Sequence, residues 1–194
     1  MTRFEYVSIF NGIVVAVALE NVASSFHKLL EAGDRVRWHW MAPTNAIGAS
    51  IATLGQFWLW WVGRDAQFGQ PTFLTFVPAA VTAIPLYLVC AATLPDSAPE
   101  SGIDLRRFYF SSRRQLWSLV LAVTLLRLAV EVLAIMRAKF DPRMVDLDAP
   151  FLAGSLAGAA VAGSMIFVRA PWWNGLGIIA VTAGTILLFG PMKL

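Results

Sequence analysis

The sequence has few of the residues on which most enzymes and small secreted domains depend. One cysteine, Cys90, and two histidines, His27 and His39, occur among 194 residues. These numbers exclude a disulfide framework and a zinc site with the usual cysteine and histidine spacing. The motifs HExxH, CxxC and GxSxG and the P-loop glycine pattern are absent as well, so we expect no enzyme, no cofactor and no metal site.

Charged residues are also scarce. They make up 14% of the chain, against 58% hydrophobic residues, and the mean hydropathy is +0.65. That leaves too little polar surface to cover a soluble globule. The net charge is only +3, and lysines and arginines stand in short clusters between apolar stretches, so the pI of about 9.4 indicates membrane flanks rather than nucleic-acid binding. Composition therefore predicts an integral membrane protein.

Six apolar stretches approach the roughly 20 residues that a helix needs to cross a bilayer. They predict an all-α fold, a polytopic membrane helix bundle formed by a single domain over residues 1–194, with five or seven spans as the alternatives. Ala16-Val17-Ala18 imitates a signal-peptide cleavage site, but Glu5 and Asn11 interrupt that pattern, so the first stretch is predicted to be an uncleaved helix. The six ranges are 6–30, 41–62, 72–94, 115–137, 150–169 and 172–191.

Local signals mark several of these boundaries. Ser112-Arg113-Arg114-Gln115 has the form of a capping box and predicts the start of the fourth span. Pro150 suits the first turn of the fifth span. Pro78 and Pro85 fall inside the third span, where each removes a backbone hydrogen bond, so that helix is predicted to be kinked.

Positive charges suggest an orientation and a lipid contact. The side with the first, third and fifth loops carries eight lysines and arginines against six on the other, which favours both termini outside. The third loop interleaves Arg106, Arg107, Arg113 and Arg114 with aromatic residues. An interfacial helix that binds anionic lipid headgroups is one interpretation, and an ordinary topology anchor is the other.

Polar side chains inside the predicted spans form the candidate functional site. Counted from one face, Glu20 and Arg127 lie at similar depths of about 15 and 18 Å. An isolated charge at the bilayer centre costs about 2.5–3.5 kcal/mol, so we predict that the two pair inside the bundle. Such a site either lines a path for an ion or small polar solute or braces three helices together. The predicted residues are Glu20, Asn21, Gln56, Arg127 and Glu131, with Gln56 near Glu131.

Small residues in the fifth span predict close helix packing. Gly154 and Gly158 form a GxxxG motif, and Gly163 extends the same face. The partner is either the sixth span or a second copy of the chain. Six short helices leave little room for an internal pore, so a protein that conducts is expected to be a homo-oligomer.

Three stretches of the sequence indicate where in the cell the protein lies. FEYVSIFNGIVVAVALENV (residues 4–22), QFWLWW (residues 56–61) and DLRRFYFSSRR (residues 104–114) together resemble an uncharacterised family of bacterial multi-pass integral membrane proteins. The resemblance covers most of the chain and implies the bacterial inner membrane, but no activity. From the residues themselves we expect a channel or transporter for an ion or small polar solute. The alternative is a noncatalytic membrane subunit or sensor that binds another membrane protein.

Overall fold

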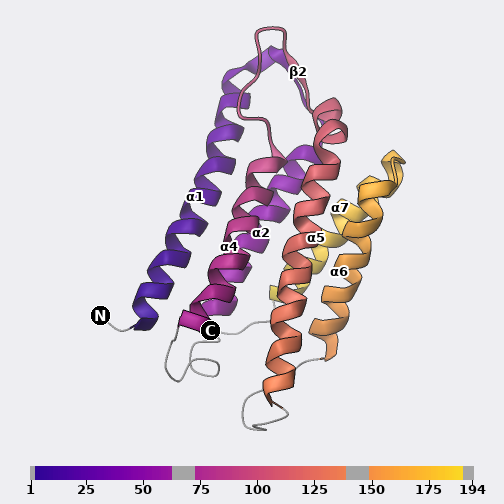
Figure 1. Ribbon diagram of the computed structural model, residues 1–194. Coiled ribbons are helices and arrows are strands. Elements are labelled where there is room, and N and C mark those ends of the chain that lie inside the picture. The colour runs from indigo at the N-terminus through magenta and orange to yellow at the C-terminus, as the bar shows by residue number, and fades with distance from the viewer. Residues whose placement is uncertain (1–2, 63–72, 139–148, 190–194) are drawn as a thin grey trace.

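Six α-helices run alternately up and down in the computed structural model, which describes residues 3–62, 73–138 and 149–189 (Figure 1). Connections α1–α2, α4–α5 and α6–α7 lie at one end of the bundle, the top of Figure 1, which we call the strand end. The predicted all-α architecture is therefore confirmed. The helices are α1 (Arg3–Glu31), α2 (Met41–Val62), α4 (Phe73–Thr93), α5 (Leu105–Ala138), α6 (Ala149–Phe167) and α7 (Pro171–Phe189).

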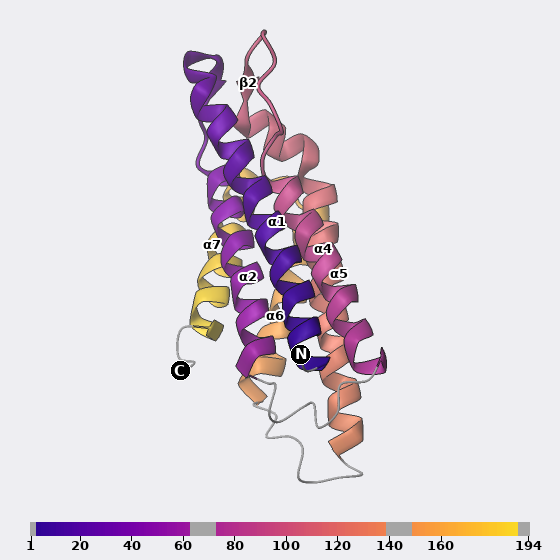
Figure 2. The ribbon, with the colours of Figure 1, turned by 90° about the vertical axis from the view of Figure 1, so that its left-hand side faces the viewer.

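The helices pack in a defined order around α2 and α4. Helix α4 packs against α1, α2 and α5, while α6 packs against α5 and α7, and α7 also packs against α2. Figures 1 and 2 show that α1 and α5 lie on different sides of α4. The core between α5, α6 and α7 includes the fully buried side chains of Trp117, Met165 and Ile178.

Helix α5 begins earlier than its apolar stretch predicts. It starts at Leu105, not at residue 115, because Asp104 caps it: the carboxylate oxygen Oδ1 accepts hydrogen bonds from the backbone N–H of Arg106 at 2.8 Å and of Arg107 at 3.1 Å. The predicted capping box is wrong, since the Ser112 hydroxyl lies inside the helix and donates to the Phe108 carbonyl. Pro150 does lie in the first turn of α6, as predicted.

Two short strands join the connections at the strand end. Strand β1 (Val36–Arg37) follows a 3₁₀ turn, Gly33–Arg35, and pairs in parallel with β2 (Ile103–Asp104), directly before α5. Gly102 precedes β2 with a φ of 82°, and a Cβ atom there would lie 2.8 Å from the Arg35 carbonyl oxygen. Only glycine fits both the backbone conformation and the space.

By length and hydropathy, one helical segment among the described residues qualifies as a membrane span. It is Ser8–Glu31 in α1, and two shorter apolar segments are Ala80–Thr93 and Leu152–Phe167. The six observed helices coincide with the six predicted spans, give or take their ends. That these helices cross a bilayer stays a prediction.

Close glycine packing occurs mainly outside the predicted motif. Gly154, Gly158 and Gly163 lie on α6, where a Cβ at Gly158 would be 3.9 Å from the Thr124 side chain of α5 and one at Gly163 would have no described neighbour within 4 Å. A Cβ at Gly48 of α2, in contrast, would lie 2.7 Å from the Thr182 hydroxyl of α7. A Cβ at Gly177 of α7 would likewise lie 2.6 Å from the Met165 side chain of α6, so the tight contacts are made by glycines of α2 and α7.

Gly48→Ala is expected to lower the free energy of unfolding by about 1–2 kcal/mol, because the added methyl group has no space against Thr182. Thermal or denaturant unfolding of the purified protein measures the change. Gly163→Ala is the matched control and should cost nothing, since alanine favours a helix over glycine. Adding Thr182→Ala to Gly48→Ala should restore most of the loss; a double variant no better than Gly48→Ala would contradict the contact.

Candidate functional site

The charged residues predicted to pair lie on helices that are not neighbours. Glu20 is exposed on α1 and Arg127 is half-buried on α5, with α4 between the two helices. This arrangement does not support the predicted Glu20–Arg127 ion pair. Asn21 is half-buried on α1, and Glu131 belongs to α5, but its side chain lies outside the described part of the structure.

Gln56, in contrast, lines a small cavity between α1, α2 and α4. The cavity has a volume of about 20 Å³, and its polar lining comes from Asn11, Thr53, Gln56 and Thr82. Among the described atoms, the buried Nδ2 of Asn11 and the buried Oε1 of Gln56 have no hydrogen-bond partner. One is a donor and the other an acceptor, and a cavity of this size holds about one water molecule. The arrangement can therefore bind a small polar molecule inside the bundle.

In the sequence, Asn11 stands out only as a polar residue that interrupts an apolar stretch. An amide in such a stretch is itself a signal, because a buried amide requires hydrogen-bond partners. What the sequence could not supply was the partner, since Asn11 and Gln56 come from different helices.

A buried hydrogen-bond network ties α5 to α7 near the strand end. The Tyr109 hydroxyl donates to Oδ1 of Asn174 at 2.8 Å and accepts from the Trp117 indole at 3.0 Å. Nδ2 of Asn174 donates to the carbonyl oxygens of Val168 and Ala170, at 3.1 and 2.9 Å. Asn174 is fully buried, so this network fixes the turn between α6 and α7 against α5.

Arg113 lies beside this network and is only 2% exposed. Its NH1 group donates to the carbonyl oxygens of Met165, at 3.2 Å, and Val168, at the C-terminal end of α6, where carbonyl groups lack helical partners. Its NH2 atom is buried and has no hydrogen-bond partner among the described residues. Burial, and then the positive charges of Arg169 and Arg114, lower the pKa of Arg113, although a guanidinium stays protonated at neutral pH.

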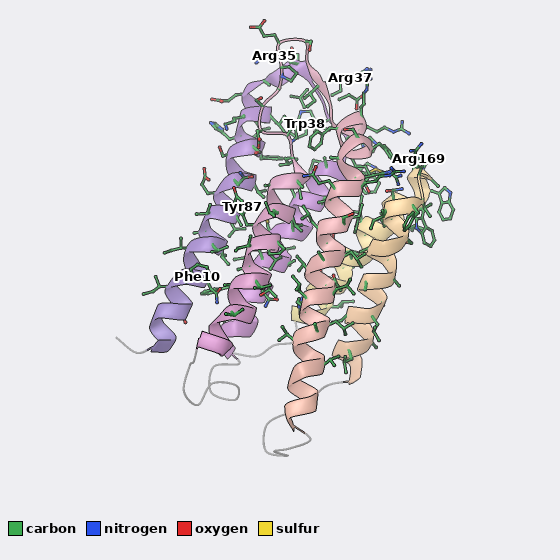
Figure 3. All side chains as sticks on the ribbon, viewed as in Figure 1. Phe10, Arg35, Arg37, Trp38, Tyr87 and Arg169 are labelled. Atoms are coloured by element: carbon green, nitrogen blue, oxygen red, sulfur yellow. The ribbon has the colours of Figure 1, made fainter. Side chains whose placement is uncertain are left out.

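Three arginines share one hollow at this end of the molecule. We call it the basic hollow; it has a volume of about 370 Å³ and is lined by Phe110, Ser111, Arg113, Arg114 and Arg169. Arg169 stands in the turn between α6 and α7, at the same end of the bundle as Arg35 and Arg37 (Figure 3).

The basic hollow includes only part of the predicted lipid headgroup site. Arg113 and Arg114 line it, whereas Arg106 and Arg107 are exposed in the first turn of α5 and are not among its lining residues. Arg169 lies in a different loop and is far from the other two arginines along the chain, so no local sequence pattern groups the three.

Comparison with protein-family models, with curated proteins and with solved structures finds no match.

Proposed function

We propose that the chain is a multi-pass membrane protein that acts, as a homo-oligomer in the bacterial inner membrane, as a channel or transporter for an ion or small polar solute. The observation that carries the proposal is the cavity inside the bundle, where Nδ2 of Asn11 and Oε1 of Gln56 are buried without a hydrogen-bond partner among the described residues. Buried polar groups between membrane helices commonly mark a solute or ion pathway.

The distribution of charge supports the membrane location. Helices α2, α4, α6 and α7 contain no lysine, arginine, aspartate or glutamate. Large apolar side chains are exposed on the outside of all six helices, as a lipid-facing surface requires. Such side chains include Ile13, Val17, Ile47, Leu54, Ile84, Leu125, Leu156, Ile179 and Leu187.

The cavity is too small to be an open pore within one subunit. A volume of about 20 Å³ holds one water molecule and does not form an open passage. A conducting path therefore requires either movement of α1 against α2 and α4 or a pathway between copies of the chain.

Flux measurements test the proposal. The full chain, reconstituted into liposomes, should pass at least one of a set of small ions and neutral polar solutes. Gln56→Leu should reduce that flux at least about tenfold, because it replaces the amide with an apolar group that cannot bind the solute. Asn45→Leu is the matched control: Asn45 is also on α2 but donates to the Met41 carbonyl, outside the cavity, so its flux should remain near wild type.

Equal flux in the two variants would contradict the role of the cavity. Absence of flux for every solute would contradict transport itself.

A second candidate function, a noncatalytic membrane subunit or sensor, is favoured by the position of Glu20. Its carboxylate is exposed on α1, on a helix that also exposes Ile13 and Val17. A charge among lipid-facing residues requires a partner, which a helix of another membrane protein could supply. Native purification followed by partner identification distinguishes the two: a defined partner that Glu20→Leu releases, together with no flux, would favour the subunit.

A further inference from the structure

The basic hollow is a feature that transport through the bundle does not use. It is formed by residues of α5 and of the α6–α7 turn, at the strand end, whereas the amide cavity lies between α1, α2 and α4. At about 370 Å³ it has the size of a small-ligand site.

Arg113 lines this hollow and has a buried donor atom without a hydrogen-bond partner among the described residues. Its NH1 group is held by the carbonyl oxygens of Met165 and Val168, so the guanidinium plane is fixed. The buried NH2 atom of the same side chain has no partner among the described residues. A buried, charged donor without an acceptor is costly, and Arg113 is among the residues that line the hollow, so an anion bound there would lie beside its guanidinium group.

Electrostatics in the hollow also favour an anion. Arg113, Arg114 and Arg169 are all cationic, and no carboxylate is among the residues that line the hollow. Three like charges close together repel one another in the absence of a counter-charge. A ligand with more than one negative charge, or with several oxygen acceptors, would relieve this repulsion.

We propose that the basic hollow is a binding site for a phosphate group, with the guanidinium groups of Arg113, Arg114 and Arg169 as hydrogen-bond donors. Guanidinium groups match the oxygen geometry of phosphate and bind it with two parallel hydrogen bonds. Phosphate of this kind comes either from an anionic phospholipid headgroup or from a soluble phosphate compound.

Neighbouring aromatic residues are suited to the lipid source. Trp172 and Trp173, in the first turn of α7, follow Arg169 closely, are 66% and 36% exposed, and pack edge to face with centroids 5.5 Å apart. Tryptophan is enriched at the depth of lipid headgroups, because its ring is apolar and its N–H is polar. If the six helices cross the bilayer as proposed, the phosphate site lies at its surface.

Two double variants with the same change in net charge test the site. Arg114→Gln with Arg169→Gln removes the two exposed arginines of the basic hollow, and Arg106→Gln with Arg107→Gln removes two exposed arginines on the same helix but outside it. Neither variant changes Arg113, which also caps α6. The probes, each added to the full chain in neutral detergent, are inorganic phosphate and detergent-solubilised phosphatidylglycerol, with phosphatidylcholine as the zwitterionic comparison.

The hollow variant should bind the effective probe at least about 30-fold more weakly than the wild type, because it loses the charge-assisted hydrogen bonds of two arginines to phosphate. The control variant should remain within about threefold of wild type. Binding of inorganic phosphate identifies a site open to soluble phosphate compounds, and binding of phosphatidylglycerol but not of inorganic phosphate or phosphatidylcholine identifies a headgroup site. Equal loss in the two variants, or no binding of either probe by the wild type, would overturn the proposal. Because phosphate binding is measured in detergent, it can fail or succeed independently of solute flux.

Discussion

Asn174→Leu is expected to lower the free energy of unfolding by about 3 kcal/mol, the largest effect that we predict for a single substitution. Leucine has a similar volume but removes the acceptor of the Tyr109 hydroxyl and both donors to the α6–α7 turn. Each buried polar group left without a partner costs about 1–3 kcal/mol. Reversible denaturant unfolding of the purified protein measures the loss.

A double-variant cycle separates this network from a simple packing defect. Tyr109→Phe removes the other half of the hydrogen bond, so the combined variant should lose less stability than the sum of the two single variants, by about 1 kcal/mol or more. Asn45→Leu on α2 is the control and should change stability by less than about 0.5 kcal/mol. Strictly additive losses for Asn174 and Tyr109 would argue against a direct coupling.

The helices could be predicted from the sequence because apolar stretches and charged breaks follow one another along the chain. The predicted ranges and the observed helices differ by a few residues at most ends. The exception is the start of α5, where the segment from Arg106 to Arg114 is rich in arginines and aromatic residues and is helical all the same. Tertiary contacts explain this, since Tyr109 and Arg113 of that segment bond to residues of α7 and of the end of α6.

The candidate ion pair could not be predicted in the same way. Depth along a helix places Glu20 and Arg127 at one level but says nothing of the order in which helices pack around the bundle. That order follows from side-chain packing across many residues, and it puts α4 between α1 and α5. Depth counted along the helices leads to Gln56, which lines a cavity, but not to the other amide that lines it, which belongs to Asn11 of α1.

The basic hollow is a second site of which only a part can be predicted from the sequence. Arg113 and Arg114 can be predicted to act together because they are adjacent in an arginine-rich segment of the sequence. Arg169 reaches the same hollow because α6 packs against α5, where Arg113 bonds to the Val168 carbonyl, 55 residues along the chain. The cap that Arg113 gives to α6 brings the next residue, Arg169, to the hollow.

The stability of the protein is expected to fall by up to about 3 kcal/mol between about pH 10 and pH 12 through Tyr109 alone. Tyr109 precedes the proposed span, and burial raises its pKa from 10.0 to about 12, with the Trp117 hydrogen bond and the charge of Arg113 acting in the opposite direction. Below pH 10 the phenol is neutral in both folded and unfolded chains. Between the two pKa values only the unfolded chain ionises, so unfolding becomes more favourable, by about 1.4 kcal/mol per pH unit.

Comparing unfolding of the wild type and of Tyr109→Phe across this pH range isolates the effect, because other groups that titrate there are common to both chains. Tyr109→Phe should start less stable at pH 8, since it lacks the bonds to Asn174 and Trp117, and should decline less steeply, so the two stabilities converge toward pH 12. Tyr87→Phe on α4 is the matched control and should keep the full decline due to Tyr109. Parallel declines for wild type and Tyr109→Phe would show that the phenol ionises as readily in the folded chain as in the unfolded one, and that the α5–α7 network is open to water.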